Sequence, residues 1–480
     1  MTMSVADEQG PSIQGALGQA IRHHNSGRLS HAEDIYRQIL QTDPNQPVAL
    51  HLLGLIAHQL ENYHAAADLI MKAIALKPDY AEAHCDLGLT FHEQGRFDEA
   101  TASYQKALSI LPDLAVAHCN LGLTLESLGK LDESVSSYQK SIAIAPQFAE
   151  AHNSLGNAFD KMGRLDEAVA SYQKAIAINP NFAEAHNNLG NGFDKLGRAE
   201  EAMASYRKAL AIRPDFAGAY YNLHALLLDS GDLEPSIKCI ENAVKIIPQN
   251  SSWRFILGLL LDYSGNPKEA ASHFDLIEIE DTLNRAKLDA WRYLKSTNKI
   301  LPTIIGSSIQ AFELGINAAI DHGLVLEFGV RFGTSIRQIA ALVGQEVHGF
   351  DSFEGLPEAW HNEPKGSYST NRYIPTVPEN VILHDGWFED SLPEFVQNYR
   401  SPIRFINIDC DIYSSTRTIL ECLANQIVPG TVMVFDEYIG NENWREDEFK
   451  AFQEAVQNYG WKYEYLCFSF TTNQVVIRIF

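Results

Sequence analysis

Acidic side chains close four predicted strands in the last third of the chain. Each of these strands is a short apolar run that ends in one or two carboxylates. In an open α/β sheet the carboxyl ends of the strands lie at one edge, where ligands bind. Several carboxylates at one edge repel one another unless a cation lies between them, and oxygen ligands in this number suit Mg²⁺ or another hard divalent ion. The acids are Glu327, Asp351, Asp409 with Asp411, and Asp436 with Glu437.

A glycine turn follows the first of these strands. The apolar run 324–326 ends in an acid, and Gly329 and Gly333 then precede a helical pattern that begins at Thr334. Glycines let the backbone approach a ligand, and a carboxylate such as Asp351 can accept both hydroxyl protons of a ribose. The turn lacks the Gly-x-Gly-x-x-Gly pattern with which a dinucleotide site seats a pyrophosphate. It therefore predicts a nucleoside site of another kind.

Strands and helices alternate through this region, which predicts an α/β domain with a Rossmann-like sheet. Residues 471–473 can join the last two strands only as an antiparallel hairpin, so we expect seven strands with the last one reversed. The long connection 354–378 is typical of a lid or acceptor wall, and its His361 is a weaker candidate for a base. Strands are expected near 324–328, 347–351, 380–384, 403–409, 430–436, 462–468 and 474–480, and helices near 307–320, 334–343, 391–399, 415–425 and 445–458.

The preceding part of the chain repeats every 34 residues. Prolines keep this step from Pro44 to Pro248, and glycines keep it from Gly27 to Gly265, with Glu61 as the one exception. A glycine after one helix and a proline ending the next define a two-helix hairpin. Residues 288–294 would extend the last unit as a capping helix. The eight units are 13–46, 47–80, 81–114, 115–148, 149–182, 183–216, 217–250 and 251–284.

These hairpins resemble the tetratricopeptide repeat (TPR), which forms an all-α superhelix. TPR arrays bind peptides or helices in a concave groove, and the resemblance implies a protein or peptide partner. Asparagine amides in the groove can bridge the N–H and C=O of a peptide backbone. Residues 179–190 are similar to the repeats of O-GlcNAc transferases, which use such an Asn ladder, and the alternative is a row of solvated side chains. The predicted groove residues are Asn120, Asn157, Asn188, Asn191 and Asn222.

The glycine turn resembles motif I of the class I S-adenosylmethionine (SAM) dependent methyltransferases. This resemblance implies SAM as the cofactor, with Asp351 as the acid that binds the ribose. Trp387 would lie against the adenine, although it is equally a candidate for the core. The other residues implied are Glu327, Gly329, Gly333 and Thr334 beside the methionine part, Ser352 and Phe353 beside the adenosine, and Asp385 and Gly386 beside the adenine.

Blocks at 349–358, 386–393, 408–416, 429–430 and 435–438 resemble the macrocin-type sugar O-methyltransferases, which are metal-dependent and methylate a hydroxyl.

This resemblance implies that Asp409 and Asp436, which match the metal-binding acids of the family by position, are metal ligands. Glu437 occupies the position of the third ligand, where the family usually has Asp. Glutamate is one methylene longer, which changes the geometry of the third ligand. Asp409 is alternatively a general base. Asp411 is a further candidate for a catalytic role, or it caps the helix that opens near Ser415.

Composition narrows the choice of partners and location. The formal net charge of −24 over 480 residues argues against nucleic acids and anionic membranes as partners. No apolar run is long enough for a membrane span, and residues 1–14 lack the features of a signal peptide. Six scattered cysteines without a Cys-x-x-Cys pair indicate a reduced cytoplasmic location and no zinc site.

The sequence therefore predicts a two-domain enzyme. We expect a disordered segment 1–12, a TPR superhelix 13–296, a linker 297–304 and a SAM-dependent methyltransferase domain 305–480. The repeats would recruit a protein or hold a homo-oligomer together, while the domain methylates a hydroxyl of a sugar-like, secondary-metabolite or protein-attached acceptor. The alternative is an interaction scaffold with a weak or inactive methyltransferase-like domain. A glycosyltransferase is disfavoured because the C-terminal region is too short for two nucleotide-sugar domains.

Overall fold

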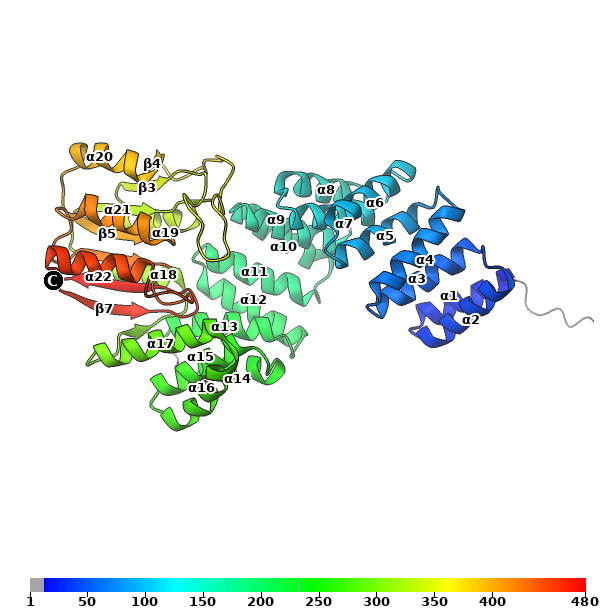
Figure 1. Ribbon diagram of the computed structural model, residues 1–480, viewed down its shortest axis with the longest axis horizontal. Helices are drawn as coiled ribbons and strands as arrows, with labels where there is room; N and C mark the ends of the chain where they lie inside the picture. The colour runs from blue at the N-terminus through cyan, green and yellow to red at the C-terminus, as the bar shows by residue number, and fades with distance from the viewer. Residues whose placement is uncertain (1–12, 232) are drawn as a thin grey trace, which may run out of the picture. The chain divides into compact units, whose positions relative to one another are not determined.

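The computed structural model describes residues 13–231 and 233–480, which fall into two compact units, Met1–Pro180 and Asn181–Phe480 (Figure 1). The predicted disordered segment 1–12 lies outside the described residues. The boundary between the units falls inside the repeat array. The last three predicted repeats therefore belong to the same compact unit as the α/β domain.

The first unit consists of helix pairs. From the second pair onward, the first helix of a pair carries a glycine against the second helix. An added Cβ would lie only 2.7 Å from the Tyr104 ring at Gly88 and 2.5 Å from the Tyr172 ring at Gly156. The turn inside a pair takes a positive φ, which Glu61 adopts (60°) where the other turns have glycine. The helices are α1 (Ile13–Asn25), α2 (Leu29–Thr42), α3 (Pro47–Gln59), α4 (Tyr63–Leu76), α5 (Ala81–Glu93), α6 (Phe97–Ile110), α7 (Ala115–Ser127), α8 (Leu131–Ile144), α9 (Ala149–Lys161) and α10 (Leu165–Ile178).

The second unit begins with three further pairs and one extra helix. The capping helix predicted as an extension at 288–294 is longer and separate, because the Asp281 carboxylate accepts hydrogen bonds from the N–H groups of Leu283 (2.9 Å) and Asn284 (3.3 Å) and so starts a new helix. The helices are α11 (Ala183–Lys195), α12 (Ala199–Ile212), α13 (Ala217–Asp229), α14 (Leu233–Ile246), α15 (Ser251–Tyr263), α16 (Pro267–Glu280) and α17 (Thr282–Thr297).

An eight-stranded sheet forms the centre of the α/β domain, in the order β1-β7-β8-β6-β5-β2-β3-β4. As predicted, β8 is reversed: it pairs antiparallel with β6 and β7. The strand that the sequence did not predict is β1, two residues long, which pairs parallel with β7. The strands are β1 (Thr303–Ile304), β2 (Leu324–Phe328), β3 (Val347–Asp351), β4 (Val381–Asp385), β5 (Ile403–Ile408), β6 (Val432–Phe435), β7 (Tyr463–Phe468) and β8 (Val475–Ile479).

Helices cover both faces of the sheet. Successive strand residues point to opposite faces, so Val325 and Phe405 pack with two helices on one face while Leu326 and Ile406 pack with three on the other. The first pair of helices is α18 (Ser308–Ala318) and α19 (Thr334–Val343); the other three are α20 (Phe388–Asn398), α21 (Tyr413–Leu423) and α22 (Glu448–Tyr459). The acids lie at or just after the carboxyl ends of the parallel strands β3, β5 and β6.

The last repeats share a hydrophobic core with the α/β domain (Figure 1). The Phe255 ring of α15 meets the Phe470 ring at a centroid distance of 5.1 Å. The Trp291 ring of α17 lies 5.7 Å from that of Phe468 at the end of β7. The four rings in these two contacts, of Phe255, Phe470, Trp291 and Phe468, are all buried. The repeats therefore supply part of the apolar cover for this edge of the sheet.

Candidate active site

The turn between β2 and α19 requires glycine. Gly329 has a φ of +94°, and a Cβ at this position would lie 1.7 Å from the carbonyl oxygen of Asp409. Gly333 caps α19 with a φ of 78°. The close approach lets β2 and β5 end side by side, so that the turn and Asp409 face the same space.

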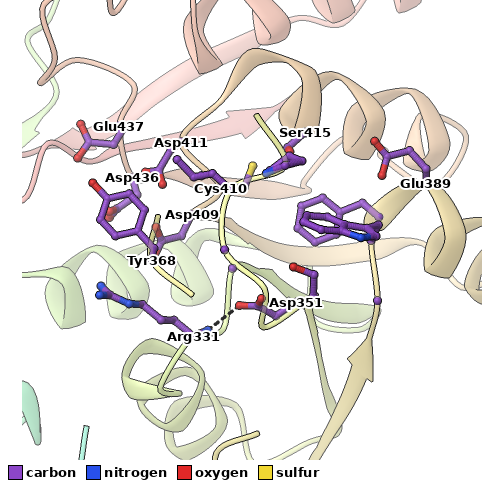
Figure 2. Close-up of a pocket in the computed structure, with 18 residues that line it drawn as sticks. Arg331, Asp351, Tyr368, Glu389, Asp409, Cys410, Asp411, Ser415, Asp436 and Glu437 are labelled. Atoms are coloured by element: carbon purple, nitrogen blue, oxygen red, sulfur yellow. Dashed lines mark hydrogen bonds between the residues drawn. The ribbon is translucent and has the colours of Figure 1, made fainter. Parts of the chain in front are cut away.

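The Asp351 carboxylate is fixed by backbone donors. Its Oδ2 accepts a hydrogen bond from the Arg331 N–H (2.7 Å; Figure 2). Its Oδ1 accepts one from the Phe353 N–H (2.6 Å). Burial raises the pKa of this carboxyl, while the two N–H groups act to lower it. The carboxylate is therefore held in one orientation at the end of β3.

A cavity of about 350 Å³ opens at this edge of the sheet, within the size range of small-molecule sites. Figure 2 shows Asp351 on one side of it and the acids of β5 and β6 on the other. Nine of the residues predicted from the sequence line this cavity: Gly329, Asp351, Ser352, Gly386, Trp387, Asp409, Asp411, Asp436 and Glu437.

Five predicted residues do not line this cavity. The Phe353 ring packs in the core, and Asp385 is exposed at the end of β4. Gly333 serves as the helix cap, and Thr334 lines a second cavity. Glu327 is fully buried and accepts a hydrogen bond from the Ser335 hydroxyl, so it anchors the start of α19.

The carboxylates of β5 and β6 gather at one end of the cavity (Figure 2). Burial, together with repulsion from Asp436 and Asp411, raises the pKa of Asp409 well above its usual range. Burial raises the pKa of Asp436 to about 7, although Gln474 Nε2 donates to its Oδ1 at 2.5 Å. Burial likewise raises the pKa of Asp411 to about 6 and that of Glu437 to about 8. The cluster therefore favours bound protons or a bound cation.

Oxygen donors of this type suit a hard divalent cation, and Asp409 and Asp436 line the same cavity. Glu437 is oriented differently: both of its carboxylate oxygens accept hydrogen bonds from Asn473 Nδ2, at 3.3 and 3.4 Å. Among the described residues, no three His, Cys, Asp or Glu side chains are arranged to hold a metal ion. The three predicted ligands thus lie in one cavity without forming a ready coordination site.

Asp411 does not cap the helix that follows it. The N-cap of α21 is Ile412, and it makes no side-chain cap hydrogen bond. Asp411 instead has a φ of 63°, a conformation that costs energy for a residue other than glycine. Arg331 (49°) and Tyr368 (64°), which also line the cavity, have the same unusual backbone. Strain of this kind gathers at functional sites, and it favours a role in the site for these residues.

Sequence reasoning did not single out Arg331, and it placed Tyr368 only within the long connection expected to be a lid or acceptor wall. The Arg331 guanidinium lies 5.2 Å from the centre of the Tyr368 ring, and both side chains border the acids (Figure 2). The signals were present, since Arg331 lies inside the glycine turn and Tyr368 lies inside the long connection after β3. His361, the weaker candidate for a base, does not line the cavity and instead contacts the Asp447 carboxylate at 3.2 Å.

A second cavity, of about 470 Å³, lies on the other side of Asp409 and Asp436. Its walls include Asn191 and Asn222, two of the predicted groove residues. Asn157, in the first unit, accepts a hydrogen bond from the Tyr172 hydroxyl (2.9 Å). Asn120 and Asn188 are half-buried. A role for this row in peptide binding stays a prediction.

Comparison with known protein families agrees with this architecture. Residues 326–438 match the model described as "Methyltransferase domain". Models described as "TPR repeat" match residues 161–197 and 193–231, and models described as "Tetratricopeptide repeat" match 46–113, 79–147, 137–170 and 217–250. The chain therefore carries tetratricopeptide repeats followed by a methyltransferase domain. No curated protein matches it significantly.

Several solved structures are similar to the chain. MamA is 27% identical, and the match covers 34% of this chain and 96% of MamA with a TM-score of 0.32. YrrB, a TPR protein with an unusual peptide-binding site, is 21% identical. The match covers 38% of this chain and 95% of YrrB, with a TM-score of 0.32. A thermophilic TPR protein from Thermus thermophilus is 23% identical. The match covers 38% of this chain and 98% of that protein, with a TM-score of 0.33.

The described residues contain no helix that is both long enough and apolar enough to cross a membrane.

Proposed function

We propose that the domain transfers the methyl group of SAM to the oxygen of a hydroxyl acceptor, while the repeats bind a protein or peptide. The observation that carries this proposal is a single cavity lined by a fixed acid at the end of β3 and by a cluster of acids at the ends of β5 and β6. The first acid, Asp351, can accept hydrogen bonds from the hydroxyls of a ribose. The acids of the cluster can take up the proton of a reacting hydroxyl.

The residues around the cavity fit the cofactor. Gly329 lets the end of β2 lie directly against the backbone of Asp409, so that the turn and this acid border the same cavity. Asp351 accepts the ribose hydroxyl protons, and Trp387 provides an aromatic surface beside the adenine. SAM supplies an electrophilic methyl group when it is bound there.

The acids at the other end of the cavity handle the proton of the acceptor. Asp409 accepts this proton as the acceptor oxygen bonds to the methyl carbon, and the carbon–sulfur bond breaks to leave S-adenosylhomocysteine. Only the ionised form of Asp409 can accept this proton, and in that form its raised pKa makes it a stronger base than an ordinary carboxylate. In the alternative mechanism, Asp409 and Asp436 would hold a divalent cation that lowers the pKa of the acceptor hydroxyl, and Asp409 would then not act as the base.

Calorimetric titration of S-adenosylhomocysteine into the full chain, once with Mg²⁺ and once with EDTA, tests the proposal. We expect a dissociation constant of about 10 µM or tighter, a free energy of about −7 kcal/mol. Tighter binding in Mg²⁺ would support the cation. Binding in neither buffer would overturn the proposal and favour an interaction scaffold whose methyltransferase domain is inactive.

A further inference from the structure

The second cavity has walls from two parts of the same compact unit. Helices α11 and α13 provide one wall, which includes Asn191 and Asn222. Helices α18 and α19 provide another, which includes Ser308 and Gln338. Asp409 and Asp436 lie at the back and also line the cofactor cavity. A group that enters between the repeats and the sheet therefore reaches the same two carboxylates as the cofactor does from the opposite side.

Direct contacts fix the repeat wall beside the sheet. A Cβ on Gly306 would lie 1.9 Å from the Ala225 carbonyl oxygen, so the chain before α18 runs directly against α13. The Gly306 N–H donates to Asp229 Oδ1 (2.7 Å), and Gln338 Nε2 donates to the Lys195 carbonyl (2.6 Å). Helices α11 and α13 of the repeats are thus part of the wall of this cavity.

A network of hydrogen bonds orients the amides of the repeat wall. The Asn191 Oδ1 accepts from the Tyr206 hydroxyl (2.8 Å) and from Asn222 Nδ2 (2.9 Å). Asn222 Nδ2 also donates to Asn187 Oδ1 (3.1 Å). Because the Asn191 oxygen already accepts two hydrogen bonds, its Nδ2 hydrogens are what this side chain offers to a ligand. Asn222 conversely offers its Oδ1, so the pair presents a donor and an acceptor, as a peptide group requires.

We propose that the second cavity is the acceptor site and that the acceptor is the hydroxyl of a Ser, Thr or Tyr side chain in a polypeptide segment held by the repeats 183–216 and 217–250. This proposal rests on the proposed methyltransferase function. The segment is neutral or basic, because a carboxylate in it would add to the repulsion that already acts between Asp409 and Asp436 at this cavity. Its backbone pairs with Asn191 and Asn222, and its hydroxyl reaches Asp409 while the methyl group approaches from the cofactor cavity.

Methyl transfer from radiolabelled SAM to peptides tests this assignment in the full chain. The probes are short neutral or basic peptides with a central Ser, Thr or Tyr, the same peptides with Ala at the centre, and a set of free methyl glycosides. The variant Asn191→Leu removes the amide, and Ser308→Trp fills the cavity from the other wall. Ser272→Trp is the matched control, since Ser272 is exposed on α16 and lines neither cavity.

We expect hydroxyl peptides to be methylated and Ala peptides not. Asn191→Leu and Ser308→Trp should each lower kcat/KM for the peptide by about tenfold or more, as the loss of a buried hydrogen bond or of space does. The dissociation constant of S-adenosylhomocysteine should stay within about threefold of the wild-type value, which is a change of roughly 0.6 kcal/mol in binding free energy. Ser272→Trp should match the wild type.

The failures are distinguishable. Wild-type protein that does not bind S-adenosylhomocysteine overturns the methyltransferase proposal itself. Cofactor binding with peptide methylation that Ser308→Trp leaves unchanged overturns the assignment of the cavity. Cofactor binding with methylation of the free glycosides only, or of no probe, overturns the polypeptide acceptor.

Discussion

Asp351 and Asp409 lie in one cavity but face different chemical tasks. Asp351 is held by two backbone N–H groups and faces the side of the cavity where a ribose would bind. Asp409 lies where two cavities meet and has a raised pKa caused by burial and by neighbouring acids. The two residues should therefore separate binding from turnover.

Alanine substitutions test this division. Asp351→Ala should weaken S-adenosylhomocysteine binding by about tenfold or more, because hydrogen bonds to a charged group contribute roughly 1.5–3 kcal/mol. Asp409→Ala should leave this binding within about threefold of the wild-type value. It should remove methyl transfer, because Asp409 is proposed to act on the acceptor hydroxyl and not on the cofactor. Calorimetry and a radiolabel assay on both variants measure the two effects. Equal loss of cofactor binding in the two variants would contradict the assigned roles.

Glu327 should make the stability of the protein depend on pH. Burial, more than repulsion from Asp351 and Asp436, raises its pKa to about 8. The folded protein therefore keeps a proton that the unfolded chain releases near pH 4 to 5, so stability is lost as pH rises toward 8. We expect a loss of roughly 2–4 kcal/mol in the free energy of unfolding between pH 5 and pH 9 from this group.

Glu327→Gln should remove most of that loss, because the amide cannot ionise and still accepts from Ser335. Denaturant unfolding of both proteins at the two pH values gives the comparison. An equally steep fall in the glutamine variant would show that other groups cause it.

The β2–α19 turn is the element on which the cofactor cavity depends most. Gly329→Ala would place a methyl group 1.7 Å from the Asp409 carbonyl oxygen at a φ of +94°. The turn and the end of β5 would have to separate, so we expect S-adenosylhomocysteine binding to fall by about a hundredfold or more, the loss of roughly 3 kcal/mol. Gly344→Ala, at the far end of α19 where no atom lies within 4 Å of the new methyl group, is the control. Similar binding by the two variants would contradict this account of the turn.

The elements that the sequence predicted best are those with a clear period. The repeat pattern predicted the helix pairs α1–α16, and the alternation of strands and helices predicted the sheet with a reversed β8. The strand β1 was missed because two residues carry no period. The length of α17 was missed because its start depends on the Asp281 cap rather than on apolar spacing.

Side-chain directions in the site were harder to predict. A carboxylate near the end of a strand can line the cavity, as Asp351 does, or be fully buried, as Glu327 is. Glu327 is in register with Gly349, two residues before Asp351, so the two acids differ in their position along the strands and not in the face of the sheet. The helix-cap interpretation of Asp411 failed for a related reason: its positive φ turns it away from the start of α21.

At the scale of the whole molecule, the methyltransferase domain depends on its repeats. Phe468 and Phe470 pack on Trp291 and Phe255, which lie outside the predicted domain 305–480. Residues 297–480 expressed alone would expose these rings to water and lose the cover of α15 and α17. We expect this fragment to aggregate, or to unfold at least about 10 °C below the same domain in the full chain, which corresponds to a few kcal/mol.

Thermal unfolding followed with and without S-adenosylhomocysteine measures that difference, and the fragment 181–480, which is one compact unit, provides the comparison. A fragment 297–480 as stable as the longer one would show that the shared core contributes little.

The central claim is that a SAM-dependent methyltransferase site lies between Asp351 and the acids of β5 and β6. A crystal structure of the full chain with S-adenosylhomocysteine tests this most directly. We predict that both ribose hydroxyls lie within hydrogen-bonding distance of the Asp351 carboxylate, that the adenine lies against Trp387, and that the sulfur faces Asp409. A ligand bound elsewhere, or in the same cavity with its ribose away from Asp351, would contradict the account.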